Sequence, residues 1–312
     1  MLWPKKKAAT KPYKILRRAV FLGGLLFLVR LNYRRCMIRS SISNFFRDIT
    51  AWLVVALFMF PILWWAIVSI QPASAIFDIE QINFFNFIPT INNYILTLTD
   101  LGSSLFNSRE AILNSLVVAL GSTVLVILVG ISAAFSLSHH LNAYKHNFII
   151  AVFLSRIAPP IATIIPIYVT YRTLGLNDTW AGLILAHTAM NAPLAILMLK
   201  SFVDDVPREM FEAAKIDGAT EFQLMSKILI PNINGGLVTT AILCFIFSWT
   251  EFLMATYLTD QMHMLPVQLS ILRMADWGPV AALSTATLVP SFVAILLVRK
   301  NLVRGLTWGL QK

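Results

Sequence analysis

Few side chains of this chain could do chemistry, and most of them lie in long apolar segments. Arg156, His187 and Asn191 lie within such segments, and Glu251 directly follows one. His187, Asn191 and Arg156 form no set with recognisable catalytic roles. The chain has no Gly-Lys pair, and therefore no phosphate-binding G-x-x-x-x-G-K-[ST] loop, and it lacks H-E-x-x-H, C-x-x-C and G-x-S-x-G. We therefore expect that this chain has no catalytic residue, no metal site and no cofactor. We also expect that it is not an enzyme.

The elements that must hold these side chains are long apolar helices. Of the 312 residues, 57% are hydrophobic and 13% are charged, whereas a soluble domain carries about 25% charged residues. About 20 apolar residues cross the hydrocarbon core of a bilayer. Six nearly charge-free runs of 19 or more residues occur, at about 51–70, 111–137, 147–171, 180–199, 232–250 and 280–298. The sequence therefore predicts an all-α membrane protein with six transmembrane helices.

Basic residues are distributed unevenly around these six runs. With the N-terminus in the cytoplasm, the cytoplasmic segments hold 21 of the 25 Lys and Arg residues and the outside loops hold three. This is the positive-inside pattern, which predicts that both termini are cytoplasmic. The net charge of +10 therefore indicates topology and attraction to anionic membrane lipid, rather than binding to nucleic acid.

Arg156 and Glu251 are the charges nearest to the predicted spans. In straight helices that rise 1.5 Å per residue, Arg156 would lie about 15 Å deep and Glu251 about 28 Å from the inner edge, which disfavours a direct ion pair. Arg156 could act in a solute pathway or its gate, or it could pack helices through a hydrogen bond. Glu251, near the outer mouth, could belong to a pathway or could simply be exposed at the interface.

Residues 1–47 form a basic extension ahead of the first predicted span. The extension holds an apolar run of 11 residues, AVFLGGLLFLV, between basic segments. This run is too short to cross a membrane, and no small-residue cleavage site follows it as in a signal peptide. We expect a retained cytoplasmic or interfacial helix. A partly disordered basic tail is the alternative.

The segment EAAKIDGATEFQLMSKILIP, at 212–231, is a polar island between the fourth and fifth apolar runs. Pro207 suits the first turn of a helix and Gly218 suits the left-handed position that closes one, which predicts a short helix over 207–216. Residues 220–223 fit a capping box, which predicts that a second helix follows and leads to the fifth span.

This short helix is predicted to dock a partner. Ala213 and Ala214 would let another surface approach closely, and Met210 and Phe211 would offer apolar contacts on an otherwise exposed helix. The segment resembles the E-A-A signature of the permease subunits of ABC importers. The resemblance is carried by Glu212, Ala213, Ala214, Asp217, Gly218, Ala219 and Pro231.

Further segments are similar to the maltose-type carbohydrate branch of this family. These segments are ILNSLVVALGSTV (112–124), RIAPPIATIIPIY (156–168), LGLNDTWAGLI (174–184), WTEFLMA (249–255), LPVQL (265–269) and VRGLTWG (303–309). The resemblance covers roughly residues 50–312. The N-terminal extension, Ser-His-His at 138–140 and Thr250 depart from the family pattern.

The resemblance implies the type I ABC importer permease fold in a bacterial inner membrane, and a transport cycle by alternating access. It implies three partners or partner sets: a second homologous permease subunit, two ATPase subunits that bind ATP and Mg, and a periplasmic binding protein. The residues expected to couple to the ATPase are Glu212, Ala213, Ala214, Asp217, Gly218 and Pro231. The expected parts are the extension (1–47), the first span with a periplasmic loop (48–110), the transmembrane core (111–303) with its coupling loop (200–231), and a cytoplasmic tail (304–312).

A sugar pathway is the finer expectation. His187 and Asn191, four residues apart, share one helix face and could hydrogen-bond sugar hydroxyls or neighbouring backbone. Trp249 could stack on a sugar ring, although a place in the aromatic belt at the membrane surface is the preferred interpretation. Arg156 and Glu251 complete the candidate pathway. A permease for a non-sugar solute is the close alternative, and a secondary transporter is disfavoured because the chain shows no internal repeat.

Overall fold

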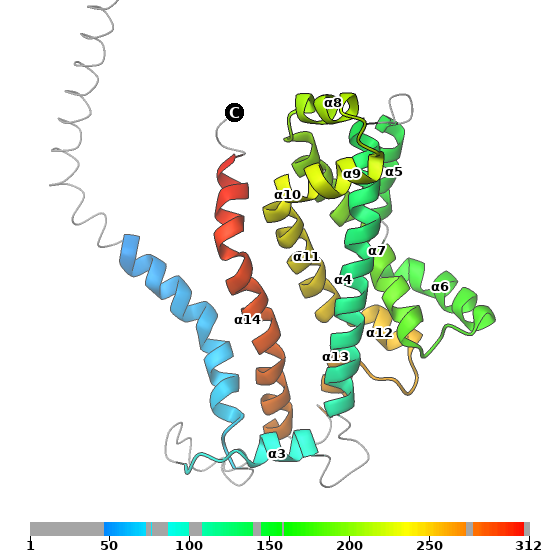
Figure 1. The fold of residues 1–312 in the computed structure, drawn as a ribbon. Helices are drawn as coiled ribbons and strands as arrows, with labels where there is room; N and C mark the ends of the chain where they lie inside the picture. The colour runs from blue at the N-terminus through cyan, green and yellow to red at the C-terminus, as the bar shows by residue number, and fades with distance from the viewer. Residues whose placement is uncertain are drawn as a thin grey trace, which may run out of the picture. The chain divides into compact units, whose positions relative to one another are not determined.

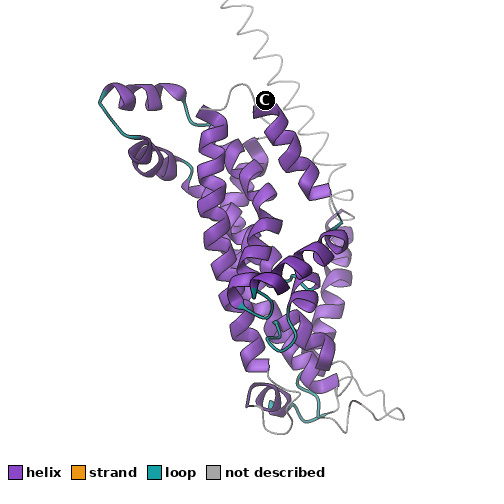
Figure 2. Ribbon diagram, turned by 90° about the vertical axis from the view of Figure 1, so that its right-hand side faces the viewer, coloured by secondary structure: helices purple, strands orange, loops and turns teal. Residues whose placement is uncertain are grey.

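The computed structural model describes residues 47–72, 76, 87–99, 108–139, 145–157, 159–272 and 277–308. Every regular element in these ranges is a helix (Figure 2). The chain divides into two compact units, residues 1–64 and residues 65–312. The helix expected in the basic extension falls in residues 1–46, which lie outside the described residues.

The first described helix runs from Arg47 to Val68 and is long and apolar enough to cross a membrane. It agrees with the run predicted at 51–70. Within the first unit, the rings of Phe60 and Trp64 stack one helical turn apart, with centroids 6.3 Å apart. Most side chains of residues 47–60 are exposed and apolar, as expected for a helix that faces lipid.

The second unit contains a bundle of long helices (Figure 1). In it, α4 (Ser108–His139) packs along α7 (Trp180–Asp204), and α11 (Asn234–Trp249) contacts α4, α7 and α14 (Trp277–Trp308). Small residues permit this close packing: a Cβ on Gly130 of α4 would lie 3.1 Å from the Leu199 side chain of α7. Small residues are typical of helix contacts in membranes, where lipid supplies no hydrophobic driving force.

Two helix pairs are sharply bent, one within the third predicted span and one where residues 221–232 lead into the fifth. α5 (Lys145–Ile157) meets α6 (Pro160–Leu174) at 95°, and the helical segment 221–232 meets α11 at 84°. With each pair taken as one span, the described residues hold up to six spans, which agrees with the prediction. The run at 147–171 was expected to be one helix and is broken instead. Pro159 and Pro160 explain the break, because proline removes a backbone donor and disfavours helix at the preceding residue.

The two ends of the bundle differ in what they carry. At one end lie α8 (Arg208–Ile216), α9 (Glu221–Gln223), η1 (Leu224–Leu229) and α10 (Ile230–Asn232), on the same side as the C-terminal end of α14 (Figure 1). At the opposite end α3 (Asn92–Thr99) packs against α14. The short helices α12 (Leu253–Leu258) and α13 (Leu265–Leu272) follow α11 away from the α8 end. The coupling loop and the C-terminal helix end therefore share one side, as the predicted topology requires.

Candidate functional site: the coupling segment and a buried polar cluster

The coupling segment, residues 207–232, begins with a helix whose two ends are set by its own sequence. α8 spans Arg208–Ile216 and follows Pro207, close to the predicted 207–216. Gly218 has φ of 84°, the left-handed conformation that glycine adopts most easily. The N–H of Ala219 then donates to the carbonyl of Ala214 at 2.9 Å and closes the helix. The predicted helix and its glycine stop are confirmed.

The second helix of the coupling segment begins at a capping box. The Gln223 N–H donates to Thr220 Oγ1 at 3.3 Å, and the Thr220 N–H donates to Gln223 Oε1 at 2.9 Å. Lys215 of α8 pairs with Glu221 at 3.2 Å, which ties the two helices together. The helix then continues through η1, a π-helical turn in which the Ile230 N–H donates to the Met225 carbonyl. The capping box was predicted from the sequence, and the π-helical turn was not.

Phe211 fixes the coupling segment to the bundle. Its side chain is 2% exposed, and its ring centroid lies 6.1 Å from that of Phe135 and 4.4 Å from that of His139, both near the end of α4. The expectation that Phe211 offers an exposed contact is therefore wrong. An isolated helix of nine residues is unstable in water, so α8 needs a buried anchor of this kind.

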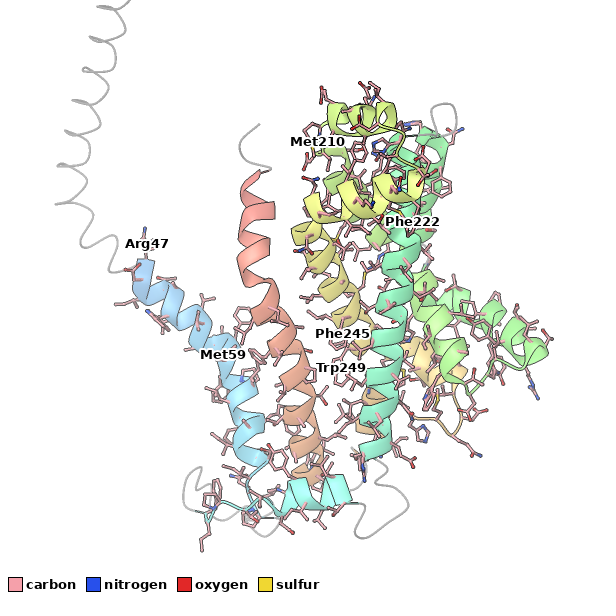
Figure 3. All side chains as sticks on the ribbon, in the orientation of Figure 1. Arg47, Met59, Met210, Phe222, Phe245 and Trp249 are labelled. Atoms are coloured by element: carbon pink, nitrogen blue, oxygen red, sulfur yellow. The ribbon has the colours of Figure 1, made fainter. Side chains whose placement is uncertain are left out.

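The outer side of the coupling segment keeps large apolar side chains in solvent. Ile216 is 87% exposed, Phe222 is 71% exposed and Met210 is 41% exposed, and Figure 3 labels Met210 on α8 and Phe222 on α9. Ala214 is half-buried against the cluster that contains Phe211. Ala219 is half-buried against the same cluster, and the other residues of the family signature are exposed: Glu212, Ala213, Asp217, Gly218 and Pro231. An apolar surface on rigid helices is suited to docking another protein.

A buried polar cluster joins three helices of the bundle. Ser122 of α4 and Ser248 of α11 share a hydrogen bond of 2.9 Å, and Ser248 Oγ lies 2.6 Å from Nδ1 of His187 on α7. Nε2 of His187 lies 3.6 Å from Oε2 of Glu251. All four residues are at most 8% exposed. A carboxylate buried this deeply is stable only with polar partners. His187 Nε2 lies beyond hydrogen-bond distance of it, so its hydrogen bonds come from the backbone that follows.

Glu251 also starts the next helix. α11 ends at Trp249 and α12 begins at Leu253, so Glu251 lies in the break between them. Its carboxylate accepts the N–H of Met254 at 3.0 Å and the N–H of Ala255 at 3.2 Å. A carboxylate at this position satisfies free donors of the first helical turn and interacts favourably with the helix dipole. The expected alternative of simple exposure at the interface is wrong.

Arg156 of α5 contacts two other helices. Its Nη1 donates to the Met190 carbonyl of α7 at 3.0 Å, and its guanidinium lies 5.7 Å from the centroid of the Phe247 ring of α11. This supports the alternative of a helix-packing hydrogen bond. Arg156 lies at the end of α5, one residue before the break between α5 and α6. The expectation that Arg156 and Glu251 form no direct pair agrees with the partners that each side chain has.

Trp249 lies inside the bundle rather than in an aromatic belt. Its side chain is 1% exposed, stacks on Phe245 at 5.9 Å and donates from Nε1 to the Thr287 carbonyl of α14 at 3.2 Å. The preferred interpretation from the sequence is therefore wrong, because α14 covers the ring. In this conformation the ring offers no free face for a sugar, so its pathway role stays a prediction.

Asn191 and His187 are both buried on α7, as their spacing predicted. Asn191 is 2% exposed, and its Oδ1 accepts no hydrogen bond from the residues that the structure describes. The structure therefore brings together His187 and Glu251, with Asn191 one turn away, and gives Arg156 and Trp249 other contacts.

Sequence reasoning missed Ser122 and Ser248. The one feature of the sequence that could have indicated them is that each is a hydroxyl side chain inside a predicted apolar span. Across the described part of the chain, no three His, Cys, Asp or Glu residues gather as a metal ion would need.

Residues 126–304 match the family model described as the inner membrane component of binding-protein-dependent transport systems. The chain is 31% identical to the sulfoquinovosyl glycerol transport system permease protein SmoH of Agrobacterium fabrum, over 86% of this chain and 96% of that protein. It is 33% identical to the trehalose transport system permease protein SugB of Mycobacterium tuberculosis, over 83% of this chain and 94% of that protein.

Two solved structures have the same fold. One is a chain of a bacterial ABC transporter involved in the import of the acidic polysaccharide alginate, with a TM-score of 0.68, 19% identity, and coverage of 83% of this chain and 96% of that chain. The other is from a bacterial alginate ABC transporter in complex with a periplasmic protein that holds an alginate pentasaccharide. It has a TM-score of 0.51, 16% identity, and coverage of 82% of this chain and 94% of that chain.

Proposed function

Because the chain belongs to the family of inner membrane components of binding-protein-dependent transport systems, we propose that it is one permease subunit of an ATP-driven importer for a carbohydrate or sugar derivative. The names of the relatives support this class of solute, since they include transporters of sulfoquinovosyl glycerol and trehalose. A permease for a non-sugar solute is the alternative. The partners that we propose are a second homologous permease, two ATPase subunits that bind ATP and Mg, and a periplasmic binding protein.

The coupling segment carries this proposal. Its two short helices are fixed by a glycine stop, a capping box and the buried Phe211. The same helices leave the apolar side chains of Ile216 and Phe222 exposed to solvent. Exposed apolar surface on an ordered segment indicates a site where another protein binds. We assign this surface to an ATPase subunit. Movement of that subunit upon ATP binding would then act on α8 through a rigid contact, and drive the alternation between inward-open and outward-open states.

The orientation follows from the same assignment. ATP is a cytoplasmic substrate, so the end of the bundle that carries α8 lies in the cytoplasm. The C-terminal end of α14 shares that side, in agreement with the positive-inside distribution of Lys and Arg. Within the bundle, His187, Asn191 and Glu251 are the candidates for solute contact during the cycle. Arg156 fits a helix-packing role better.

Rebinding of purified ATPase subunits to stripped membrane vesicles tests both parts of the proposal. The subunits should bind inside-out vesicles that contain the wild-type permease pair and should not bind right-side-out vesicles. Phe222→Asp and Ile216→Asp should weaken this binding at least about tenfold, because a charge must then be buried in the contact. Tyr257→Asp is the matched control, because Tyr257 is 50% exposed on α12, away from the α8 end. Wild-type rebinding by both coupling-segment variants would refute the docking role.

A further inference from the structure

The loop between α12 and α13, residues 259–264, is held through its backbone by one distant side chain. Oδ1 of Asp178 accepts three consecutive N–H groups, from Asp260 at 3.1 Å, Gln261 at 3.1 Å and Met262 at 2.8 Å. In return, the N–H of Asp178 donates to the Leu258 carbonyl at 2.9 Å. Consecutive backbone N–H groups that converge on one anionic oxygen form a strong and directional contact.

The turn that presents Asp178 is itself tightly built. Asp178 has φ of 57° and is the one non-glycine residue with positive φ among those that the structure describes. Aspartate tolerates this conformation better than most residues, at a cost of about 1 kcal/mol. On one side Gly175 ends α6 with φ of 68°, and on the other Thr179 Oγ1 accepts the N–H of Gly182 and begins α7. A Cβ on Gly182 would collide with the Leu176 carbonyl, so this turn has little freedom.

The far end of the loop is anchored independently of Asp178. Met264 and Leu265 are at most 1% exposed. The Leu265 N–H donates to Ser115 Oγ at 2.7 Å, and Asn114 Nδ2 donates to the His263 carbonyl at 3.1 Å. Loss of the Asp178 carboxylate would therefore loosen residues 260–262 and leave the rest of the loop attached to α4.

The loop presents polar side chains on a fixed backbone. Asp260 and Gln261 are its exposed residues, and the other four are buried or half-buried. α13, which follows the loop, lies toward the end of the bundle opposite the coupling segment (Figure 1). A loop that is ordered before binding loses less conformational entropy when a partner docks on it. A strained residue with three bonds to one loop therefore indicates that the shape of this loop matters for a contact.

We propose that Asp178 is a positioning residue that preorders the 259–264 loop as a docking surface for the solute-binding protein. This inference rests on the proposed function, because the binding protein is the partner expected at the side opposite the ATPase subunits. One of the related solved complexes contains such a periplasmic protein. Asp178 acts through the loop backbone, and Asp260 and Gln261 supply the side chains that meet the partner.

The test uses the assembled importer in lipid nanodiscs and the solute-binding protein that co-purifies with it. Asp178→Gly keeps the positive φ without strain and removes the acceptor, whereas Asp178→Asn keeps an acceptor oxygen at the same position. The Gly variant should raise the half-saturating concentration of loaded binding protein in the ATPase assay by about tenfold, equivalent to about 1.4 kcal/mol. Its basal and maximal ATPase rates should not change. The Asn variant should stay within about threefold of the wild type.

A nitroxide at Gln261→Cys gives the second readout, because its spectrum reports loop order without any partner. The label should be more mobile in the Gly variant than in the wild type or the Asn variant. An unchanged half-saturating concentration in the Gly variant, or its failure to assemble, would overturn the positioning role. A wild-type importer whose ATPase does not respond to binding protein would instead refute the proposed function, and the label would still decide whether Asp178 orders the loop.

Discussion

The coupling segment and the buried polar cluster place their side chains in opposite environments. The coupling segment keeps apolar side chains such as Ile216 and Phe222 in water, and the polar cluster keeps His187 and Glu251 away from water. Both arrangements are unfavourable for a chain considered alone. The difference between them is the sequence distance of the contacts involved. The capping box joins residues three apart, whereas the Ser122–Ser248 bond joins residues 126 apart.

This difference separates two kinds of function. A docking surface can be specified by residues that are close in sequence, because a short helix is fixed by the residues that cap its two ends and by one buried anchor. A site that must change during transport has to connect separate helices, so that their relative movement alters it. Glu251 meets this condition, since it pairs with α7 and caps α12 at the same time.

The largest effect is expected from Glu251→Leu. This change leaves His187 without its carboxylate partner and removes the acceptor of two N–H groups at the start of α12. Leaving these two buried N–H groups without an acceptor costs about 1–3 kcal/mol for each group. Uptake into proteoliposomes should be almost abolished, while the ATPase subunits should still co-purify. Glu251→Gln keeps one acceptor oxygen and should retain partial uptake. Wild-type uptake by the Leu variant would show that the polar cluster is not needed for transport.

A smaller effect, confined to the coupling segment, is expected from Phe211→Ala. Deletion of a buried Phe side chain costs about 3 kcal/mol, and here the loss falls on the attachment of α8 to α4. Hydrogen exchange of residues 208–216 should become faster, and co-purification of the ATPase should weaken. Met210→Ala is the control, because Met210 is 41% exposed and its removal should leave exchange unchanged. Equal exchange rates in the two variants would mean that Phe211 is not the anchor.

The smallest effect is expected from Gly218→Ala. A Cβ there would meet no atom within 4 Å, so the cost comes from the backbone alone, at φ of 84°. That cost is about 1 kcal/mol, and affinity for the ATPase subunit should fall about fivefold. Gly235→Ala adds the same methyl group in equally open space, without a positive φ, and should be neutral. A neutral result at Gly218 as well would show that the end of α8 needs no left-handed residue.

The sequence was most informative where the deciding residues are neighbours. The six apolar runs, the stop at Gly218 and the capping box at Thr220 were all predicted, because periodicity and end signals act within a few residues. The bend at Pro159 was not predicted. Two prolines remove backbone donors, and the resulting direction depends on packing against α7.

The polar cluster could be predicted only in part. His187 and Asn191 were assigned to one face of α7 by their spacing, and Glu251 was identified as a charge close to a span. The pairing of His187 with Glu251 depends on how α7 and α11 cross, which a sequence pattern does not contain. Trp249 was misassigned for the same reason, since α14 covers its ring. The role of Asp178 depends on a loop more than 80 residues further along the chain.

The π-helical turn at Leu224–Leu229 has a consequence for the phase of the helix that contains it. A π-helical turn holds its carbonyls to donors five residues on, so it carries about one residue more than an α-helical turn would. One residue corresponds to about 100° of rotation around a helix axis. The turn therefore offsets the face of α9 that bears Phe222 from the face that leads through Pro231 into α11. A shortened chain could close the same segment as regular α-helix, but the docking face would then point a quarter-turn or more away from its partner.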